Sequence, residues 1–205
     1  MKKFFADKRI QNGMTYQTYF NQFNHYLNQS ENGYQTKEAI EKFNNIKLNY
    51  QRSLRIHKTY EPSNELVKTI QQIDVPQIWM VISEHWCGDS AQNLPYIAEI
   101  AKLNSNIDLR VVLRDDNPDI MDEYLTEGKL RSIPKLVAFD EDGNELFQWG
   151  PRPKSAGDLV MNAKKEGKEK NEFMTLLHKW YANNKGEELE KEILFLISEN
   201  IFTNN

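Results

Sequence analysis

The first third of the chain carries apolar residues at helical spacing. Aromatic residues recur at steps of three and four across residues 15–29, which predicts one face of a helix. Asn32-Gly33 indicates a turn, and Thr36 offers an N-cap for a longer helix that ends near Tyr60. A third, shorter helix is predicted over residues 64–73, before Pro76 stops it.

The period of the pattern changes at residue 77. Short apolar runs rich in branched and aromatic residues predict buried strands, and they cover residues 77–83, 107–113, 135–140 and 145–150. Helical patterns alternate with them over residues 89–103, 117–128 and 155–165, and two more follow over 171–183 and 187–202. The predicted order from residue 77 is β-α-β-α-β-β-α, which indicates an α/β fold.

Composition narrows the class of protein. The 205 residues include 26 basic and 30 acidic side chains, a formal charge of −4, and the basic ones are dispersed along the chain, so no nucleic-acid partner is indicated. No apolar run approaches the roughly 18 residues of a membrane span, and the N-terminus lacks the apolar core of a signal peptide. We therefore expect a cytoplasmic protein with no membrane partner; nothing in the sequence indicates its oligomeric state.

Cys87 is the only cysteine, so the chain has no internal disulfide. It lies where the strand over residues 77–83 meets the next helix, and unpaired amides at a helix N-terminus favour a thiolate over a thiol. Ser132-Ile133-Pro134 precedes the third strand, 47 residues further on (134 − 87), and an X-Pro bond there is a place where the fold can hold the cis isomer. The histidines show no ligand spacing, and no metal site or cofactor is expected.

These features together resemble the thioredoxin family, and more narrowly its bacterial members with a helical N-terminal extension. The resemblance is carried by Trp86-Cys87-Gly88-Asp89-Ser90 after an apolar strand, by Ser132-Ile133-Pro134 before a hairpin, and by the element order. It implies a thioredoxin-like α/β fold, a mixed four-stranded sheet flanked by helices. We expect a helical N-terminal extension over residues 1–72, the thioredoxin-like core over 73–166, and C-terminal helices packed on the core over 167–205.

Carried over residue by residue, the resemblance implies that Cys87 is the nucleophile, Trp86 its flanking tryptophan, Gly88 the motif glycine and Pro134 the cis-proline. Three positions depart from the family pattern. Ser90 stands in place of the second cysteine, Asp89 in place of a proline, and Val81 in place of the buried acid that assists proton transfer.

The chain therefore predicts monothiol chemistry on protein or small-molecule thiols and disulfides, since no internal disulfide can resolve an intermediate. The expected catalytic residues are Cys87, Ser90 and Pro134; the expected substrate-binding residues are Trp86, Gly88, Asp89 and Ile133. Two alternatives stay open. One is a non-catalytic module that docks extended peptide segments; the other is an iron–sulfur carrier similar to monothiol glutaredoxins, which Asp89 disfavours.

The same reasoning gives expectations about single residues. We expect Cys87 to be partly exposed, with a pKa below the roughly 8.5 of a free cysteine. We expect His85 in a solvent-facing loop, Arg52 on a solvated helix face, and Arg152 away from the mouth of the site.

Overall fold

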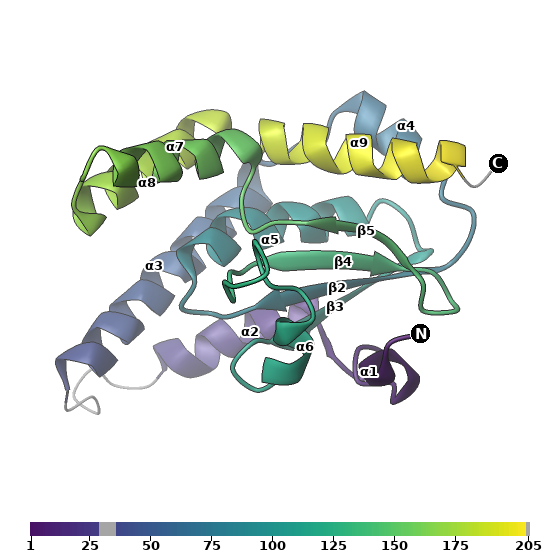
Figure 1. Ribbon diagram of the computed structural model, residues 1–205, viewed down its shortest axis with the longest axis horizontal. Helices are drawn as coiled ribbons and strands as arrows, with labels where there is room; N and C mark the ends of the chain where they lie inside the picture. Colours follow the sequence, from purple (N-terminus) through teal and green to yellow (C-terminus); the bar gives the residue numbers. More distant parts are fainter. Residues whose placement is uncertain (29–35, 204–205) are drawn as a thin grey trace.

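A mixed five-stranded sheet forms the centre of the molecule (Figure 1). The computed structural model describes residues 1–28 and 36–203, so the turn expected at Asn32-Gly33 lies outside the described residues. The strand order is β1-β3-β2-β4-β5, and the strands are β1 (Met14–Thr15), β2 (Gln77–Ser83), β3 (Ile107–Leu113), β4 (Lys135–Phe139) and β5 (Glu145–Trp149). β2 and β3 run parallel, and the other neighbouring strands are antiparallel.

The prediction of a four-stranded sheet was wrong, because the sheet has a fifth strand, β1. β1 pairs antiparallel with β3 through Met14 opposite Val111 and Thr15 opposite Arg110. Two residues carry no alternation of apolar and polar positions, so the sequence pattern gives no signal for this strand. β1 is recognisable as a strand only from its pairing with β3.

The helices follow the predicted order closely. They are α1 (Lys3–Ala6), α2 (Tyr16–Leu27), α3 (Lys37–Thr59), α4 (Asn64–Ile70), α5 (Gly88–Ala101), α6 (Pro118–Asp122), α7 (Lys154–Lys165), α8 (Lys170–Asn184) and α9 (Glu187–Thr203). The Thr36 hydroxyl accepts a hydrogen bond from the amide of Ala39 at 3.2 Å, which confirms the predicted N-cap of α3. α1 was not anticipated, because four residues are too few to show a period.

Alternate residues of β2 face two separate cores. Trp79 and Val81 belong to the larger one, which contains buried side chains of α2 to α5 and α9, whereas Met80 and Ile82 face a smaller one built with α1 and α6. Figure 1 shows α5 and α9 on one side of the sheet and α1 and α6 on the other. Because both faces are covered, β2 is apolar at successive positions, as expected of a central strand.

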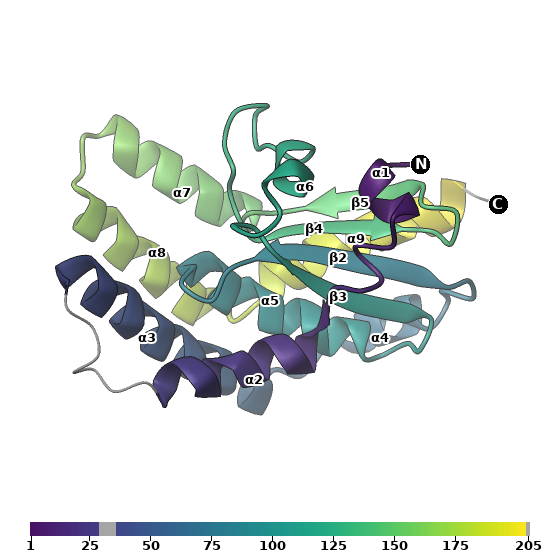
Figure 2. The same ribbon diagram turned by 90° about the horizontal axis from the view of Figure 1, so that it is seen from below.

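The two ends of the chain bring helices to the start of α5. Figure 2 shows α3 on one side of this start and α8 on the other. α7 and α8 pack on each other through their own buried cluster, which includes Val160, Leu177 and Tyr181. Within residues 1–28 and 36–203, no helix has the length and apolar character needed to cross a bilayer.

Candidate functional site

Cys87 occupies the N-cap of α5, directly after the loop that follows β2. Its Sγ accepts a hydrogen bond from the amide of Ser90 at 3.4 Å and donates one to the carbonyl of Ile133 at 3.4 Å. The Ile133-Pro134 bond is cis, which confirms the prediction that a cis-proline faces the cysteine. The fold thus brings the cysteine and the loop before β4 into contact across 46 positions of sequence.

The thiol itself differs from expectation. Cys87 is only 8% exposed, so the prediction of a partly exposed residue was wrong. Burial raises its pKa, and the carboxylate of Asp89 raises it further. These two effects outweigh the hydrogen bonds that lower the pKa of the thiol, which come from the Ser90 hydroxyl and from the amides of Ser90 and Asp89. The predicted lowering of the pKa was therefore also wrong, because desolvation outweighs the helix N-terminus.

Asp89 is the centre of a polar network. Its Oδ2 lies 2.5 Å from Nη2 of Arg152, and its Oδ1 accepts a hydrogen bond from the Tyr181 hydroxyl at 2.9 Å. The side-chain nitrogen Nδ2 of Asn93 donates to the hydroxyl oxygen of Tyr181 at 3.0 Å and to the backbone carbonyl of Asp89 at 2.8 Å. Residues from α5, α8 and the loop after β5 therefore hold one carboxylate in place beside the thiol.

Arg152 lies at the site, against the expectation that it points elsewhere. After β5 ends at Trp149, the chain turns through a cis Gly150-Pro151 bond and directs Arg152 toward Asp89. The approach of the chain here is close, since a Cβ on Gly150 would lie 2.3 Å from the carbonyl oxygen of Pro134. Burial lowers the pKa of Arg152, but the charge and hydrogen bond of Asp89 raise it by more, and the charge of Cys87 adds a smaller effect in the same direction.

Arg52 and His178 approach Gly88 from α3 and α8. A Cβ placed on Gly88 would lie 3.4 Å from Nη1 of Arg52 and 3.7 Å from Cε1 of His178. Arg52 is partly buried and donates to Oδ1 of Asn49 at 3.0 Å, so its assignment to a solvated face was wrong. Burial and the nearby charge of Arg52 lower the pKa of His178 to about 4, so this imidazole is neutral at pH 7.

His85 is buried, so its expected place in a solvent-facing loop was also wrong. Its Nε2 donates to the carbonyl of Tyr19 at 2.9 Å, and its ring stacks on the Tyr19 ring with centroids 4.1 Å apart. Burial lowers its pKa. A neutral, sequestered imidazole does not offset the charge of Asp89.

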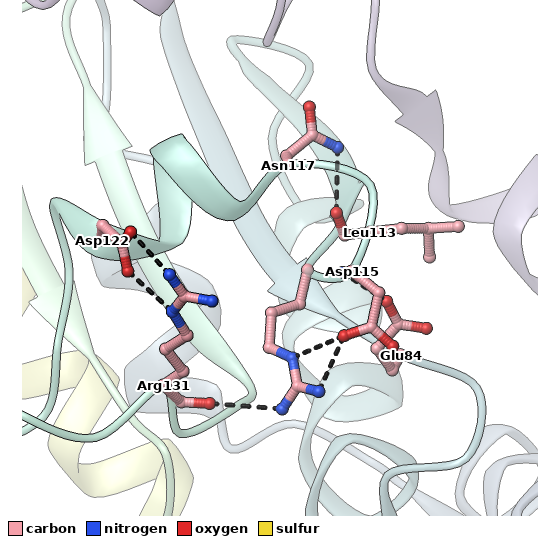
Figure 3. Close-up of polar contacts among 7 residues, drawn as sticks. Glu84, Leu113, Asp115, Asn117, Asp122 and Arg131 are labelled. Atoms are coloured by element: carbon pink, nitrogen blue, oxygen red, sulfur yellow. Dashed lines mark hydrogen bonds and ion pairs between the residues drawn. The ribbon is translucent and has the colours of Figure 1, made fainter.

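Trp86, the residue before the cysteine, is half-buried. The guanidinium of Arg114 is 4.7 Å from the centre of its ring, a cation–π contact. Arg114 also bonds Oδ1 of Asp115 at 2.7 and 2.9 Å, and the amide of Asp115 donates to Glu84 at 2.9 Å. The bond between Asp115 and Glu84 links the segments that follow β3 and β2, and Figure 3 shows these two residues side by side.

The loop before the cis-proline is fastened to the same region. Arg114 donates to the carbonyl of Arg131 at 3.4 Å, and Arg131 makes two bonds of 2.7 Å to the carboxylate of Asp122 (Figure 3). Asn117 bonds the carbonyl of Leu113 at 2.9 Å and steadies the turn after β3. In the described part of the chain, no three His, Cys, Asp or Glu side chains are grouped as metal ligands.

Sequence reasoning found the cysteine, its neighbours and the cis-proline, and it missed Arg52, Arg152, His178 and Tyr181. Tyr181 lies 92 positions from its partner Asp89. None of the four belongs to a local motif, so no signal in the sequence connects them to Cys87. Val81, at the place of the family's buried acid, is fully buried in the sheet and leaves that function without a replacement on β2.

Comparison with known proteins agrees with this architecture. The family model described as thioredoxin matches residues 21–166, a match that begins within α2. None of the curated proteins compared with the chain matches it.

Two solved structures share the fold. A protein of unknown function from Pseudomonas aeruginosa is 19% identical with a TM-score of 0.55, and the alignment covers 91% of this chain and 98% of that one. An HIV epitope-scaffold is 17% identical with a TM-score of 0.54, over 91% of this chain and 99% of that one. Since the matching family model extends over most of the sequence and the site has the cysteine and cis-proline that it implies, the chain belongs to the thioredoxin family.

Proposed function

We propose that this thioredoxin-fold protein carries out monothiol thiol–disulfide exchange through Cys87. The observation that supports it is the contact between the Cys87 sulfur and the carbonyl of Ile133, next to the cis-proline. A disulfide-bearing segment that pairs with the backbone at Ile133 as an added strand brings its own sulfur to Cys87. Ionisation of the thiol removes its hydrogen bond to Ile133 and frees that carbonyl for the segment.

The reaction has two steps. The Cys87 thiolate attacks a disulfide R–S–S–R′, forms Cys87–S–S–R, and releases R′–S⁻, which takes up a proton from solvent. An external thiol R″–SH then attacks the R sulfur of the mixed disulfide, forms R″–S–S–R, and releases the Cys87 thiolate. The two steps exchange R′–S for R″–S and leave the number of disulfides unchanged; full reduction to R–SH needs a second external thiol, because the chain has no second cysteine.

The raised pKa sets the speed of the first step. A free cysteine with a pKa of about 8.5 is roughly 3% thiolate at pH 7, and Cys87 is below that fraction. A thiolate of higher pKa is in turn the stronger nucleophile, which recovers about half of the loss on a logarithmic scale. We therefore expect slow exchange that depends on binding of the disulfide, in contrast to the fast attack of an activated thioredoxin cysteine.

Mass spectrometry of the purified chain tests this function directly. Incubation with small disulfides should add one adduct, on Cys87, and an excess of small thiol should remove it with turnover. Cys87→Ser is the matched control, since serine has nearly the same size and can keep both hydrogen bonds. An unmodified wild-type chain after incubation with several disulfides of different charge would refute the proposal.

A second candidate is a docking module that binds an extended segment without thiol chemistry. The low exposure of Cys87 and its raised pKa favour this candidate. It predicts that partner affinity survives Cys87→Ser and is lost with Trp86→Ala, which removes the ring that Arg114 covers. Monothiol exchange predicts instead that Cys87→Ser abolishes the activity.

A further inference from the structure

A groove opens beside the segment that leads into the cis-proline. It has a volume of about 600 Å³ and lies between residues 126–132, which follow α6, and the helix α7 (Figure 2). Ser132 and Arg152 both line it. Ser132 directly precedes the cis peptide bond, and Arg152 is paired with Asp89. The groove therefore adjoins the candidate site.

Both walls of the groove are fixed by the protein itself. In the segment before the cis-proline, the amide of Thr126 donates to the carbonyl of Leu130 at 2.8 Å, and the amide of Leu130 donates to the carbonyl of Thr126 at 3.0 Å. Arg131 ties the same segment to Asp122 through two bonds of 2.7 Å. The other wall is a regular helix. A preformed groove keeps the entropic cost of binding low.

Exposed apolar side chains stand on both walls. Leu130 is 54% exposed, and Met161 on α7 is 46% exposed. Both line the groove, together with Val160, Pro151 and Pro153. Concave sites of about 300–1,000 Å³ with mostly apolar walls are typical of ligand binding. The space suits one large apolar side chain with the residues that flank it.

Gly157 leaves room in the groove on the side of α7. It lies inside the helix, where glycine is a poorer helix former than any residue except proline. In the described chain, a Cβ placed on Gly157 would have no neighbour within 4 Å beyond the backbone of its own helix. Packing within the protein therefore does not require a glycine here, and the missing side chain leaves space for another molecule.

The charges of the groove favour an acidic occupant. Its lining contains four basic and two acidic side chains: Arg152, Lys154, Lys164 and Lys165, with Glu127 and Asp158. Arg152 is paired with Asp89, and Lys154 with Asp158. Among the described residues, Lys164 and Lys165 have no carboxylate within ion-pair distance, and they outnumber the remaining carboxylate of Glu127. This local positive excess, in a chain of formal charge −4, complements an acidic segment.

We propose that this groove binds an acidic segment of a partner protein and holds a large apolar side chain of that segment between Leu130 and Met161. The inference rests on the proposed exchange function and names its substrate class: disulfides carried by acidic protein segments. A segment that pairs with the backbone at Ile133 continues past Ser132, so residues a few positions from its cysteine enter the groove.

The first test detects binding without thiol chemistry. Wild-type protein is titrated with the acetylated peptide Glu-Leu-Glu-Ser-Glu-Leu-Glu, in which serine replaces the cysteine and the symmetry makes strand direction irrelevant. Backbone amide NMR signals of residues 126–132 and of α7 should shift and saturate. Peptides with lysine for glutamate, or with alanine for leucine, should bind several-fold more weakly. No shift in these two segments at millimolar peptide, or equal affinity for the lysine peptide, would refute the groove.

The second test fills the groove from α7. Gly157→Leu places a large side chain in it, whereas the matched control Gly157→Ala adds one methyl group. Both replacements are better helix formers than glycine, so neither variant should melt below the wild type. Full burial of a leucine side chain is worth about one to two powers of ten in affinity, so Gly157→Leu should weaken peptide binding at least tenfold. Gly157→Ala should keep it, and equal affinity of Gly157→Leu and wild type would contradict the proposal.

The third test removes one charge. Lys165→Gln should weaken binding of the acidic peptide about two- to fivefold. Lys68→Gln is the matched control, because Lys68 is exposed on α4, which contributes no residue to the groove; it should leave the affinity unchanged. An equal loss in both variants would overturn the assignment of the charge to the groove. This pair decides the question even if Gly157→Leu does not fold.

Exchange is measured separately, so the two proposals fail in different ways. Wild-type protein is incubated with hydroxyethyl disulfide and with the mixed disulfide of 2-mercaptoethanol and the cysteine form of the acidic peptide. Peptide binding in the groove without modification of Cys87 by either disulfide would refute the exchange function and leave a docking site for acidic segments. Modification of Cys87 without peptide binding in the groove would refute the groove and leave exchange standing.

Discussion

Replacing Asp89 with asparagine tests what controls the reactivity of Cys87. The carboxylate of Asp89 raises the pKa of the thiol and also neutralises Arg152, whose own pKa the charge of Cys87 raises. Asparagine keeps an oxygen that can accept the hydrogen bond from Tyr181 but carries no charge. The substitution therefore removes a negative charge from beside the thiol and uncovers a positive one.

Both changes lower the pKa of Cys87. A neighbouring charge within about 4–6 Å shifts a pKa by 1 to 3 units, and we expect a fall of about 1 to 2 units here. At pH 7 this increases the thiolate fraction about 10- to 100-fold, while the intrinsic nucleophilicity falls by nearly half as many powers of ten. The net rate of alkylation at pH 7 should rise about 3- to 10-fold.

The assay is the pH dependence of iodoacetamide alkylation, which reports on a single site because Cys87 is the only cysteine. Wild-type protein should show a midpoint above the 8.5 or so of a free cysteine, and Asp89→Asn a lower one. Arg152→Gln should move the midpoint upward, and the double variant should lie between the two. Tyr181→Phe keeps every charge and should leave the midpoint near the wild-type value.

A cost in stability accompanies the gain in reactivity. The side chains of Asp89 and Arg152 are 11% and 27% exposed, so the pair is largely but not wholly buried. Loss of one partner of a fully buried pair costs about 3–5 kcal/mol, and we expect about 2 kcal/mol here, measured by urea unfolding. A folded Asp89→Asn protein with an unchanged or higher alkylation midpoint would refute the argument that Asp89 and Arg152 control the thiol.

Three further predictions follow from the site. Ser90→Cys should introduce insulin reduction that wild type lacks, at a modest rate because Val81 supplies no acid. The pKa of His178 is about 4 in the folded chain and about 6.5 when unfolded, so the unfolded chain binds more protons between these values. The contribution of His178 to the free energy of unfolding should therefore be fully present above pH 6.5 and should decrease by about 1–2 kcal/mol toward pH 4, after allowance for partial exposure. An equal decrease in His178→Gln, measured by urea unfolding, would contradict this. Cys87→Ser should change the free energy of unfolding by no more than about 1 kcal/mol, because a hydroxyl can replace both hydrogen bonds of the thiol; a larger loss in thermal melts would mean that the sulfur is needed for packing.

The sequence alone determined the order of the elements and the location of the cysteine. β2 and β3 coincide with the predicted residues 77–83 and 107–113, because central strands covered on both faces are continuous apolar runs with clear ends. The residues around Cys87 and before Pro134 carried the family resemblance. These features are local in the sequence, so they can be recognised without knowing how the chain packs.

Only the tertiary structure decided the environment of the thiol. A helix N-terminus favours a thiolate wherever it occurs, but desolvation depends on what covers the sulfur, and burial prevails at Cys87. Arg52, Arg152 and Tyr181 reach the start of α5 from separate helices and loops. Charges and burial act through distance in space rather than through separation along the chain, and that distance exists only once the chain has folded.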